Sequence, residues 1–235
     1  MQPETITAFE LGVKSEPTDR LHVDAAIFDY SLTNMQISQF KNVCLAGPCP
    51  PNPTTPLGAL SNAAATQMYG AELDVEALLT PEFRIRGGLS LLDASFSSYP
   101  GASWEVPAPG GAGLVSTPAQ SAAGKEVPRA PKATLSLSAT YTKDLPLGTF
   151  TFTANGYASE RVYLDIGNVF YQPGYATLGL RATFSPASQP NLVFAAWGNN
   201  VTNVPVILGT FLNSTGAEVS YQPPATYGVT GSYKF

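Results

Sequence analysis

The feature that most constrains the fold of this chain is an alternation of apolar and polar residues with a period of two. Its clearest example is ATLSLSATYT at residues 133–142, where Ala, Leu and Tyr alternate with Ser and Thr. Successive side chains of a β-strand point to opposite faces, so the pattern predicts a strand with one apolar and one polar face. The chain ends in the same way, on YGVTGSYKF at 227–235.

Similar segments recur along the chain and predict an all-β fold. We expect nine strands, near residues 4–16, 20–38, 67–79, 84–97, 132–143, 148–162, 174–184, 191–201 and 224–235. No segment indicates a long helix, and no apolar run approaches the ~18–20 residues of a membrane-spanning helix. Most of the predicted strands exceed the ~5–6 residues common in soluble sheets and approach the ~9–11 residues of a tilted membrane strand.

The connections between these strands alternate between short and long. The short turns are 17–19, 80–83, 144–147 and 186–190, and the long connections are 39–66, 98–131, 163–173 and 202–223. A transmembrane barrel has this alternation, because its periplasmic turns are short and its extracellular loops are long. The strand directions that follow place Tyr141, Phe150, Phe184 and Phe235 on the apolar face at the periplasmic edge, as an aromatic girdle.

The composition fits a sheet that lies between lipid and water. Asp, Glu, Lys and Arg make up only 12% of the chain, against ~25% in soluble domains. The net charge of −5 argues against nucleic acid as a partner. Met1 is followed by Gln-Pro-Glu-Thr, which lacks the basic and apolar regions of a signal peptide.

Several segments, taken in order, resemble the late strands of TonB-dependent outer-membrane receptors. They are PETITAFELGVKSE, LHVDAAIFDYSLTNMQIS, MYGAELDVEALLTPEFRIRGGLSLLDASF, the Pro131-Lys132 pair, GNNVTN at 198–203 and the terminal TYGVTGSYKF. No single motif is specific, but the ordered set covers almost the whole chain. The aromatic residues Tyr233 and Phe235 match the terminal signal that the outer-membrane assembly machinery recognises in such barrels.

The resemblance implies an antiparallel up-and-down meander of about nine strands, the C-terminal part of a transmembrane β-barrel. Residues 1–235 would belong to this barrel portion, without a plug domain. Because an odd meander leaves its first and last strands parallel, we expect the sheet not to close on its own. Family members have about 22 strands around a plug. We therefore expect a receptor piece, from a truncated gene, a misplaced start or a split gene.

The function that the resemblance implies is TonB-energised uptake of a scarce ligand across the outer membrane, such as a siderophore or another organic nutrient. We expect the piece to be inactive alone. The alternative is a passive channel or a structural barrel fragment. The implied partners are outer-membrane lipid, the barrel-assembly machinery, the TonB complex through the missing plug, and a small-molecule ligand that the sequence does not identify. No cofactor is implied.

Charged residues gather on the predicted polar face, which would line the lumen. They are Glu10, Lys14, Glu72, Asp74, Glu76, Arg84, Arg86, Arg181 and Lys234. Opposite charges on 67–79 and 84–97 face one another across a short turn and would stabilise this strand pair by ~0.2–1 kcal/mol. The charges suit either a wetted barrel interior or a surface that contacts the plug. The long loops hold Tyr99, Trp104, Tyr163, Tyr171 and Phe211, which suit siderophores, sugars or other organic ligands alike.

The sequence shows no catalytic or metal-binding constellation, so we expect neither an enzyme nor a metal site. His22, the only histidine, follows a short turn, whereas outer-membrane enzymes hold their catalytic groups near the loops. The carboxylates of strand 67–79 point outward in a row and do not converge on a cation. Cys44 and Cys49 form either a loop disulfide, which we favour, or two free thiols.

Overall fold

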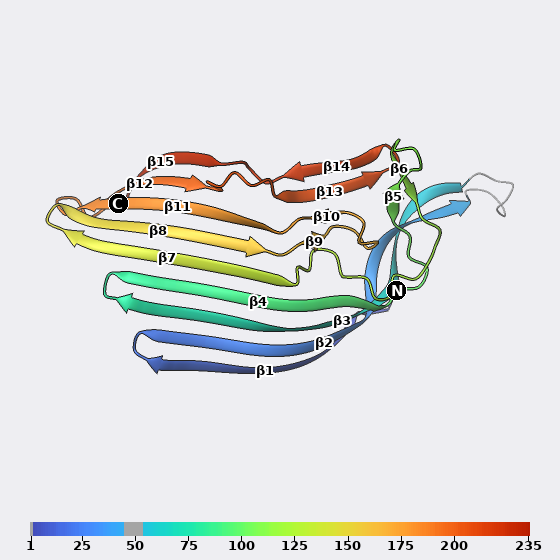
Figure 1. Cartoon of the computed structure of the whole chain (residues 1–235), viewed down its shortest axis with the longest axis horizontal. Helices are drawn as coiled ribbons and strands as arrows, with labels where there is room; N and C mark the ends of the chain where they lie inside the picture. Colours follow the sequence, from blue (N-terminus) through green and yellow to red (C-terminus); the bar gives the residue numbers. More distant parts are fainter. Residues whose placement is uncertain (1, 45–53) are drawn as a thin grey trace.

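A computed structural model describes residues 2–44 and 54–235, and these residues form an open sheet of nine antiparallel strands (Figure 1). The strands are β1 (Thr5–Thr18), β2 (Leu21–Cys44), β3 (Thr54–Thr80), β4 (Phe83–Ser98), β7 (Ala133–Leu145), β8 (Gly148–Ser159), β11 (Tyr175–Pro186), β12 (Leu192–Asn199) and β15 (Thr226–Tyr233). Each strand pairs with the next one in this order, which confirms the predicted meander. Within the described ranges, no helix is long and apolar enough to cross a membrane.

Three small hairpins in the long connections were not predicted. They are β5 (Glu105–Pro107) with β6 (Leu114–Ser116), β9 (Val162–Tyr163) with β10 (Tyr171–Gln172), and β13 (Ile207–Asn213) with β14 (Gly216–Tyr221). The expected loop at 39–66 is also wrong over most of its length, because β2 and β3 stay paired up to Cys44 and Thr54. After register shifts between Leu32 and Gln36, backbone pairing continues through this segment although its residues barely alternate.

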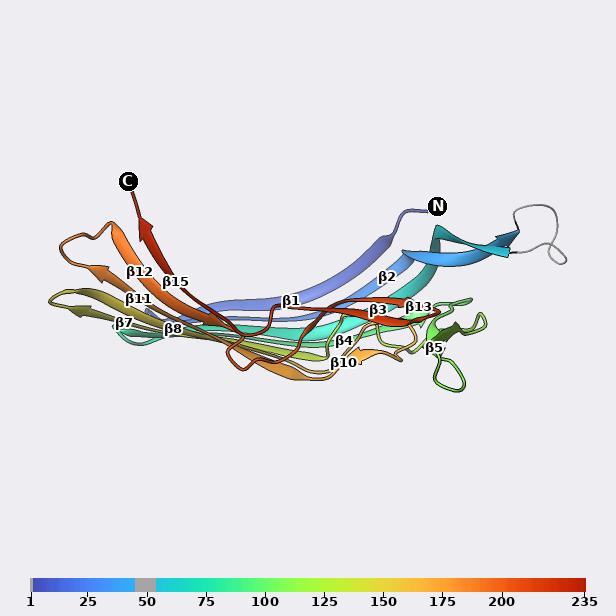
Figure 2. The ribbon, with the colours of Figure 1, turned by 90° about the horizontal axis from the view of Figure 1, so that it is seen from above.

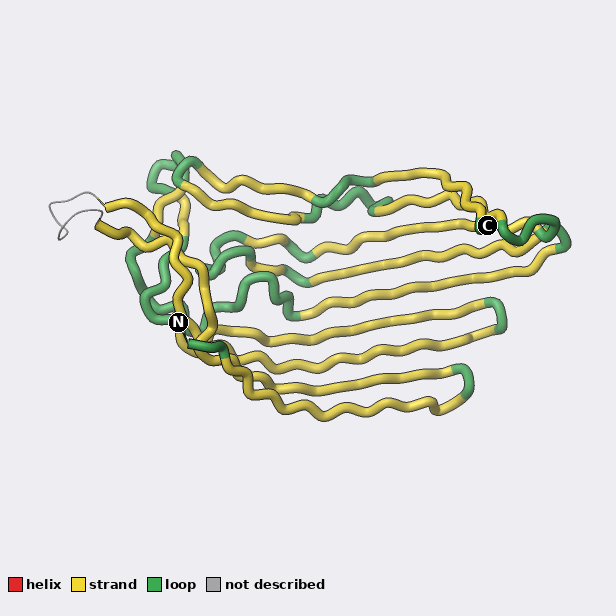
Figure 3. Tube along the Cα trace, turned by 180° about the vertical axis from the view of Figure 1, so that it is seen from behind, coloured by secondary structure: helices red, strands yellow, loops and turns green. Residues whose placement is uncertain are grey.

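The four short connections lie together at one end of the sheet, and the long connections lie at the other (Figure 3). This arrangement is the one that the alternating connection lengths predict. Figure 2 shows that the sheet is curved, with the two ends of the chain on the same side. Among the described strands, β1 and β15 form the two edges and do not pair with one another, so the sheet is open.

The register sorts side chains cleanly between the two faces of the sheet. Val13, Ala25, Leu73, Leu89 and Leu135 stand in one row across five strands. The rows on the opposite face hold charged residues, hydroxyl groups and amides. Leu135 and its neighbour Leu137 are 47% and 48% exposed, so no second layer covers the apolar face. A single sheet with one bare apolar face is the arrangement expected of a membrane barrel wall.

Aromatic residues of the apolar face lie in two rows near the short turns. One row is Phe83, Tyr141 and Phe152, and the next is Phe150, Phe184 and Phe194. Beyond β12, the rings of Tyr233 and Phe235 pack edge to face with centroids 5.2 Å apart. The rows contain three of the four aromatic residues expected in a girdle, Tyr141, Phe150 and Phe184, and the fourth, Phe235, follows the end of β15.

The buried core lies at the loop end rather than between two sheets. Its members are Ala64, Phe96, Tyr99, Ala102 and Ala122. The core residues come from β3, β4 and the connection between β4 and β7, and the residues packed against them come from β2, from the same connection and from the loop between β9 and β10. The long loops are therefore held on the sheet by a small hydrophobic core of their own.

Candidate functional site

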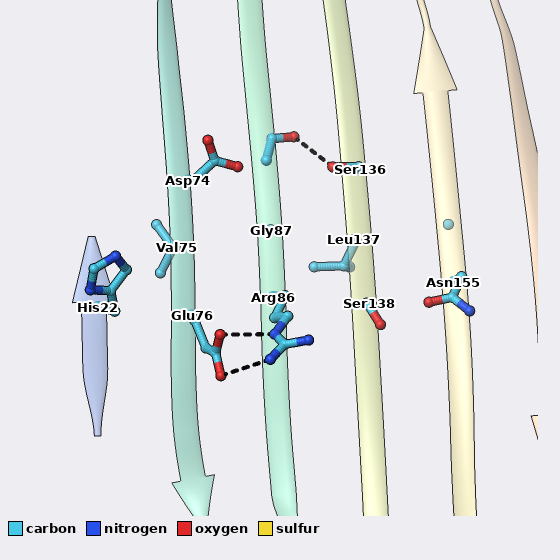
Figure 4. A pocket seen from close by; sticks show the side chains of 12 residues that line it. His22, Asp74, Val75, Glu76, Arg86, Gly87, Ser136, Leu137, Ser138 and Asn155 are labelled. Carbon is cyan, nitrogen blue, oxygen red and sulfur yellow. Dashed lines mark hydrogen bonds and ion pairs between the residues drawn. The ribbon is translucent and has the colours of Figure 1, made fainter. Parts of the chain in front are cut away.

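The polar face of β2, β3 and β4 carries a cluster of charges that we call the charged wall: His22, Asp24, Asp74, Glu76, Arg84 and Arg86. Arg86 donates from Nε to Glu76 Oε2 at 2.8 Å and from Nη2 to Oε1 at 3.2 Å (Figure 4). Arg84 Nε lies 3.4 Å from the same carboxylate. One glutamate therefore pairs with both arginines across the β3–β4 turn. This fork is the bidentate geometry that guanidinium and carboxylate groups favour.

His22 stands beside the charged wall with a carboxylate at each ring nitrogen. Its Nδ1 lies 3.4 Å from Glu16 and its Nε2 lies 3.1 Å from Asp24. A cavity of about 350 Å³ opens here, lined by His22, Asp74, Glu76 and Arg86 and extending to Asn155 on β8 (Figure 4). The described residues contain no group of three or more His, Cys, Asp or Glu that could hold a metal ion.

Lys14 joins this cluster, because its Nζ lies 4.0 Å from the Asp24 carboxylate. Three other predicted lumen charges, Glu72, Arg181 and Lys234, lie apart from it. Glu72 follows the same face of β3 one row further on, opposite Ser90. Arg181 of β11 lies in register with Thr153 and Trp197. Lys234 follows β15, and its backbone N donates to Asn191 O at 3.0 Å. The structure thus brings Glu76, Arg84 and Arg86 together but not the whole predicted set.

A second region of the polar face, which our sequence reasoning missed, carries no charge. We call it the neutral wall: Asn155, Tyr157, Thr177, Asn199 and Gln222. It borders two cavities of about 210 and 400 Å³, which share Tyr157 and Gln222. Alternation along 148–162 places Asn155 and Tyr157 on the polar face. Asn199 and Gln222 come from separate segments, and no local pattern signals that they meet.

The loop aromatics fall into buried and accessible groups. Tyr99 is completely buried in the loop core, so our expectation that it is available to a ligand is wrong. The ring of Trp104 is half-buried and lies 5.1 Å from Lys125 Nζ. Tyr163 and Tyr171 pack edge to face, with the Arg161 guanidinium 5.0 and 5.5 Å from their rings.

A backbone cage fixes the turn at 165–170. Asp165 accepts hydrogen bonds from the N–H groups of Gly167, Val169 and Phe170 at 2.7–3.0 Å. Burial raises the pKa of Asp165, and these three donors offset part of that rise. Asn168 and the backbone of Glu126 exchange two hydrogen bonds at 2.8 and 3.0 Å. The turn is thereby locked onto the connection between β4 and β7.

The predicted disulfide lies outside the residues whose side chains the structure describes. Cys49 belongs to the undescribed segment, and only the backbone of Cys44 is described, at the end of β2. The pairing of these two cysteines stays a prediction.

Comparison with known structures agrees with this architecture. The ferric yersiniabactin uptake receptor FyuA from Yersinia pestis is 18% identical, with a TM-score of 0.76, and matches over 99% of this chain and 30% of its own. The siderophore receptor PiuA from Acinetobacter baumannii is 21% identical, with a TM-score of 0.71 over 98% and 28%. The ferric-catecholate import receptor Fiu from K12 E. coli is 18% identical, with a TM-score of 0.65 over 100% and 28%. These likenesses show the fold.

The chain thus spans about three tenths of the length of the solved receptors. None of the curated protein sequences matches it. A family model described as "TonB dependent receptor-like, beta-barrel" matches residues 1–201, most of the chain. The members of this family are receptors and transporters of the outer membrane, not enzymes. The match to the family model and the nine-stranded meander lead to one conclusion: the chain belongs to the TonB-dependent receptor β-barrel family.

Proposed function

We propose that this chain forms part of the wall of an outer-membrane receptor for TonB-energised uptake of a scarce ligand, such as a siderophore or another organic nutrient. The observation that carries the proposal is the division of a single curved sheet into two faces. One face is apolar and bare, as lipid contact requires, and the other is polar and borders cavities. This division supports an outer-membrane location.

The proposal treats residues 1–235 as the C-terminal portion of the barrel, without a plug. The edges β1 and β15 support it, because each unpaired backbone group would cost several kcal/mol in lipid. Further strands are therefore needed to close the wall. TonB would engage through a plug domain that lies outside this portion. Alone, the chain would neither close a barrel nor couple uptake to TonB.

Two groups of residues take roles in this proposal. The charged wall around Glu76 would line the wetted lumen and meet a plug. Tyr233 and Phe235 at the end of β15 would serve as the signal for the barrel-assembly machinery. Phe235 is fully exposed, so its ring is free to be recognised there.

Growth of a receptor-deficient strain tests the proposal. The chain fused to a signal peptide should be exported but should not restore growth on a supplied ferric siderophore. A chimera that carries residues 1–235 in place of the matching strands of a complete receptor should restore growth, and only in cells that contain TonB. Growth that does not need TonB would favour a passive channel. No growth of a correctly assembled chimera would favour a structural fragment.

A further inference from the structure

The polar face divides into two halves of different chemistry. On β1 to β4 it carries Glu10, Lys14, Glu72 and the charged wall. On β7, β8, β11, β12 and β15 the described residues of this face carry charge only at Asp144, near the end of β7, and at Arg181. Figure 4 shows the boundary, where Glu76 and Arg86 give way to Ser136, Ser138 and Asn155.

The neutral half is hollowed near the loop end. The larger cavity, of about 400 Å³, is lined by the neutral wall together with Gly179 and Pro223. The smaller cavity, of about 210 Å³, adds Tyr175 and the loop residue Arg129. Arg129 is the only charged residue among those that line either cavity. A ligand here would meet amides, hydroxyl groups and tyrosine rings.

The polar groups of the neutral wall are open to a ligand. The side chains of Asn155, Asn199, Gln222 and Thr177 make no hydrogen bond to any described residue. Asn200, next in sequence, differs: its Oδ1 accepts from Val204 N at 3.1 Å and its Nδ2 donates to Val204 O at 2.9 Å. Asn200 thus stabilises the turn, whereas the side chain of Asn199 stays available to a ligand. Each open amide offers two donors and an acceptor.

A glycine creates the space between the two asparagines. Gly179 of β11 pairs with Asn155, and an added Cβ would lie 3.9 Å from Asn199 Oδ1. Its nearest contact, Gly198 O, would be 3.7 Å away, so a side chain fits at this position without overlap. Because Gly179 has no side chain, the amides of Asn155 and Asn199 face the same open space.

Tyrosine rings complete the cavity wall. The rings of Tyr157 and Tyr175 lie with centroids 6.0 Å apart, tilted by 49°, and Tyr157 is 39% exposed. Aromatic faces beside amides and hydroxyl groups suit a ligand that has C–H surfaces and many hydroxyl groups. An anionic metal chelate would find a single cation here, whereas a neutral saccharide could use every group of the wall.

We infer that the neutral wall binds a neutral polyhydroxylated ligand of the saccharide class. The inference rests on the proposed function, since it identifies what this barrel portion holds on its lumen side. It assigns hydrogen bonding of ligand hydroxyl groups to Asn155, Asn199 and Gln222. It assigns stacking to Tyr157.

Saturation-transfer NMR on the full chain tests this inference. The chain is held in a zwitterionic detergent without a sugar headgroup, and its sheet is checked by circular dichroism. Maltose, cellobiose and trehalose are the neutral probes, and ferric citrate is the anionic probe. We expect saturation transfer to at least one disaccharide. Asn155→Ala and Asn199→Ala should each weaken its binding by about 3- to 10-fold.

A matched pair of variants separates site from fold. Gly179→Leu should fill the cavity and abolish disaccharide binding. Gly231→Leu adds the same side chain on the apolar face of β15, where no described atom lies within 4 Å of an added Cβ, and should bind like the parent.

Each remaining outcome overturns the inference. These outcomes are binding of ferric citrate but of none of the disaccharides, binding of no probe, or disaccharide binding that Gly179→Leu and Gly231→Leu affect equally. TonB-dependent growth of the chimera on a ferric siderophore, without disaccharide binding, would sink the inference and leave the proposed function standing. Disaccharide binding that only Gly179→Leu abolishes, with uptake that does not need TonB, would support the inference and contradict the proposed function.

Discussion

Arginine at Leu137 tests whether the bare apolar face contacts lipid. Tyr141 lies in one of the aromatic rows, and Leu137 lies four residues away from it along β7. At ~3.4 Å per residue and a tilt of ~40°, this separation is about 10 Å along the membrane normal, close to the middle of an apolar band ~25 Å tall. An arginine near the midplane costs about 2–4 kcal/mol. Leu137→Arg should therefore reduce partition into lipid by about 30- to 1,000-fold.

The matched control is Ser136→Arg, one residue away on the polar face of the same strand. Its side chain would point toward Asp74, near Gly88, and should cost little. The measurement is flotation of urea-solubilised chain with phosphatidylcholine vesicles, with the bound fraction followed as lipid is varied. Equal losses for the two variants, or a greater loss for Ser136→Arg, would refute the assignment of the two faces.

Three further predictions concern a loop, a turn and the cysteines. Gly167→Ala should lower the free energy of unfolding by about 1–3 kcal/mol, because an added Cβ would overlap the Trp104 ring; urea titration followed by tryptophan fluorescence measures this. Lys143 donates to Glu82 Oε1 at 3.0 Å and holds the pKa of Glu82 below its usual range. The stability that this ion pair contributes is therefore present above pH ~4.5 and is lost as the pH falls through the lowered pKa. Lys143→Met should raise the pKa of Glu82 toward its ordinary value in an NMR titration, and an unchanged titration would contradict the assignment. Labelling of the oxidised, unfolded chain with a thiol reagent should find no free cysteine, whereas full labelling without reductant would exclude the disulfide.

The strands could be predicted because two solvents impose the pattern. In β7, the sequence predicts 132–143 and the structure has Ala133–Leu145, since lipid on one side and water on the other require alternation along the whole strand. The same pressure acts on β8 and β11, whose predicted and observed bounds also agree closely. The turns were predictable for a related reason: alternation stops where the chain leaves the lipid and water surrounds it on both sides.

The loop end could not be predicted because other forces act there. Residues 54–66 barely alternate, yet they pair with β2 through backbone hydrogen bonds that any residue other than proline donates. Tyr99 looked like a ligand contact because it stands in a polar loop, but it packs edge to face on Phe96 in the loop core. The loop core also holds Ala64 and Ala122, so the burial of Tyr99 depends on segments that are distant in sequence.

The pattern of the apolar face also determines which residues meet on the polar face. The register that aligns Leu73 with Leu89 on the apolar face also places Glu76 opposite Arg86 on the other. A slip of one residue would turn every apolar side chain of a strand toward the lumen, so burial in lipid fixes the register strongly. By the same coupling, the apolar pairing of Leu180 with Ala154 fixes Gly179 beside Asn155. Side chains of the apolar face therefore fix the positions of strand residues in the neutral wall without contacting them. This explains why the residues of the neutral wall show no motif of their own.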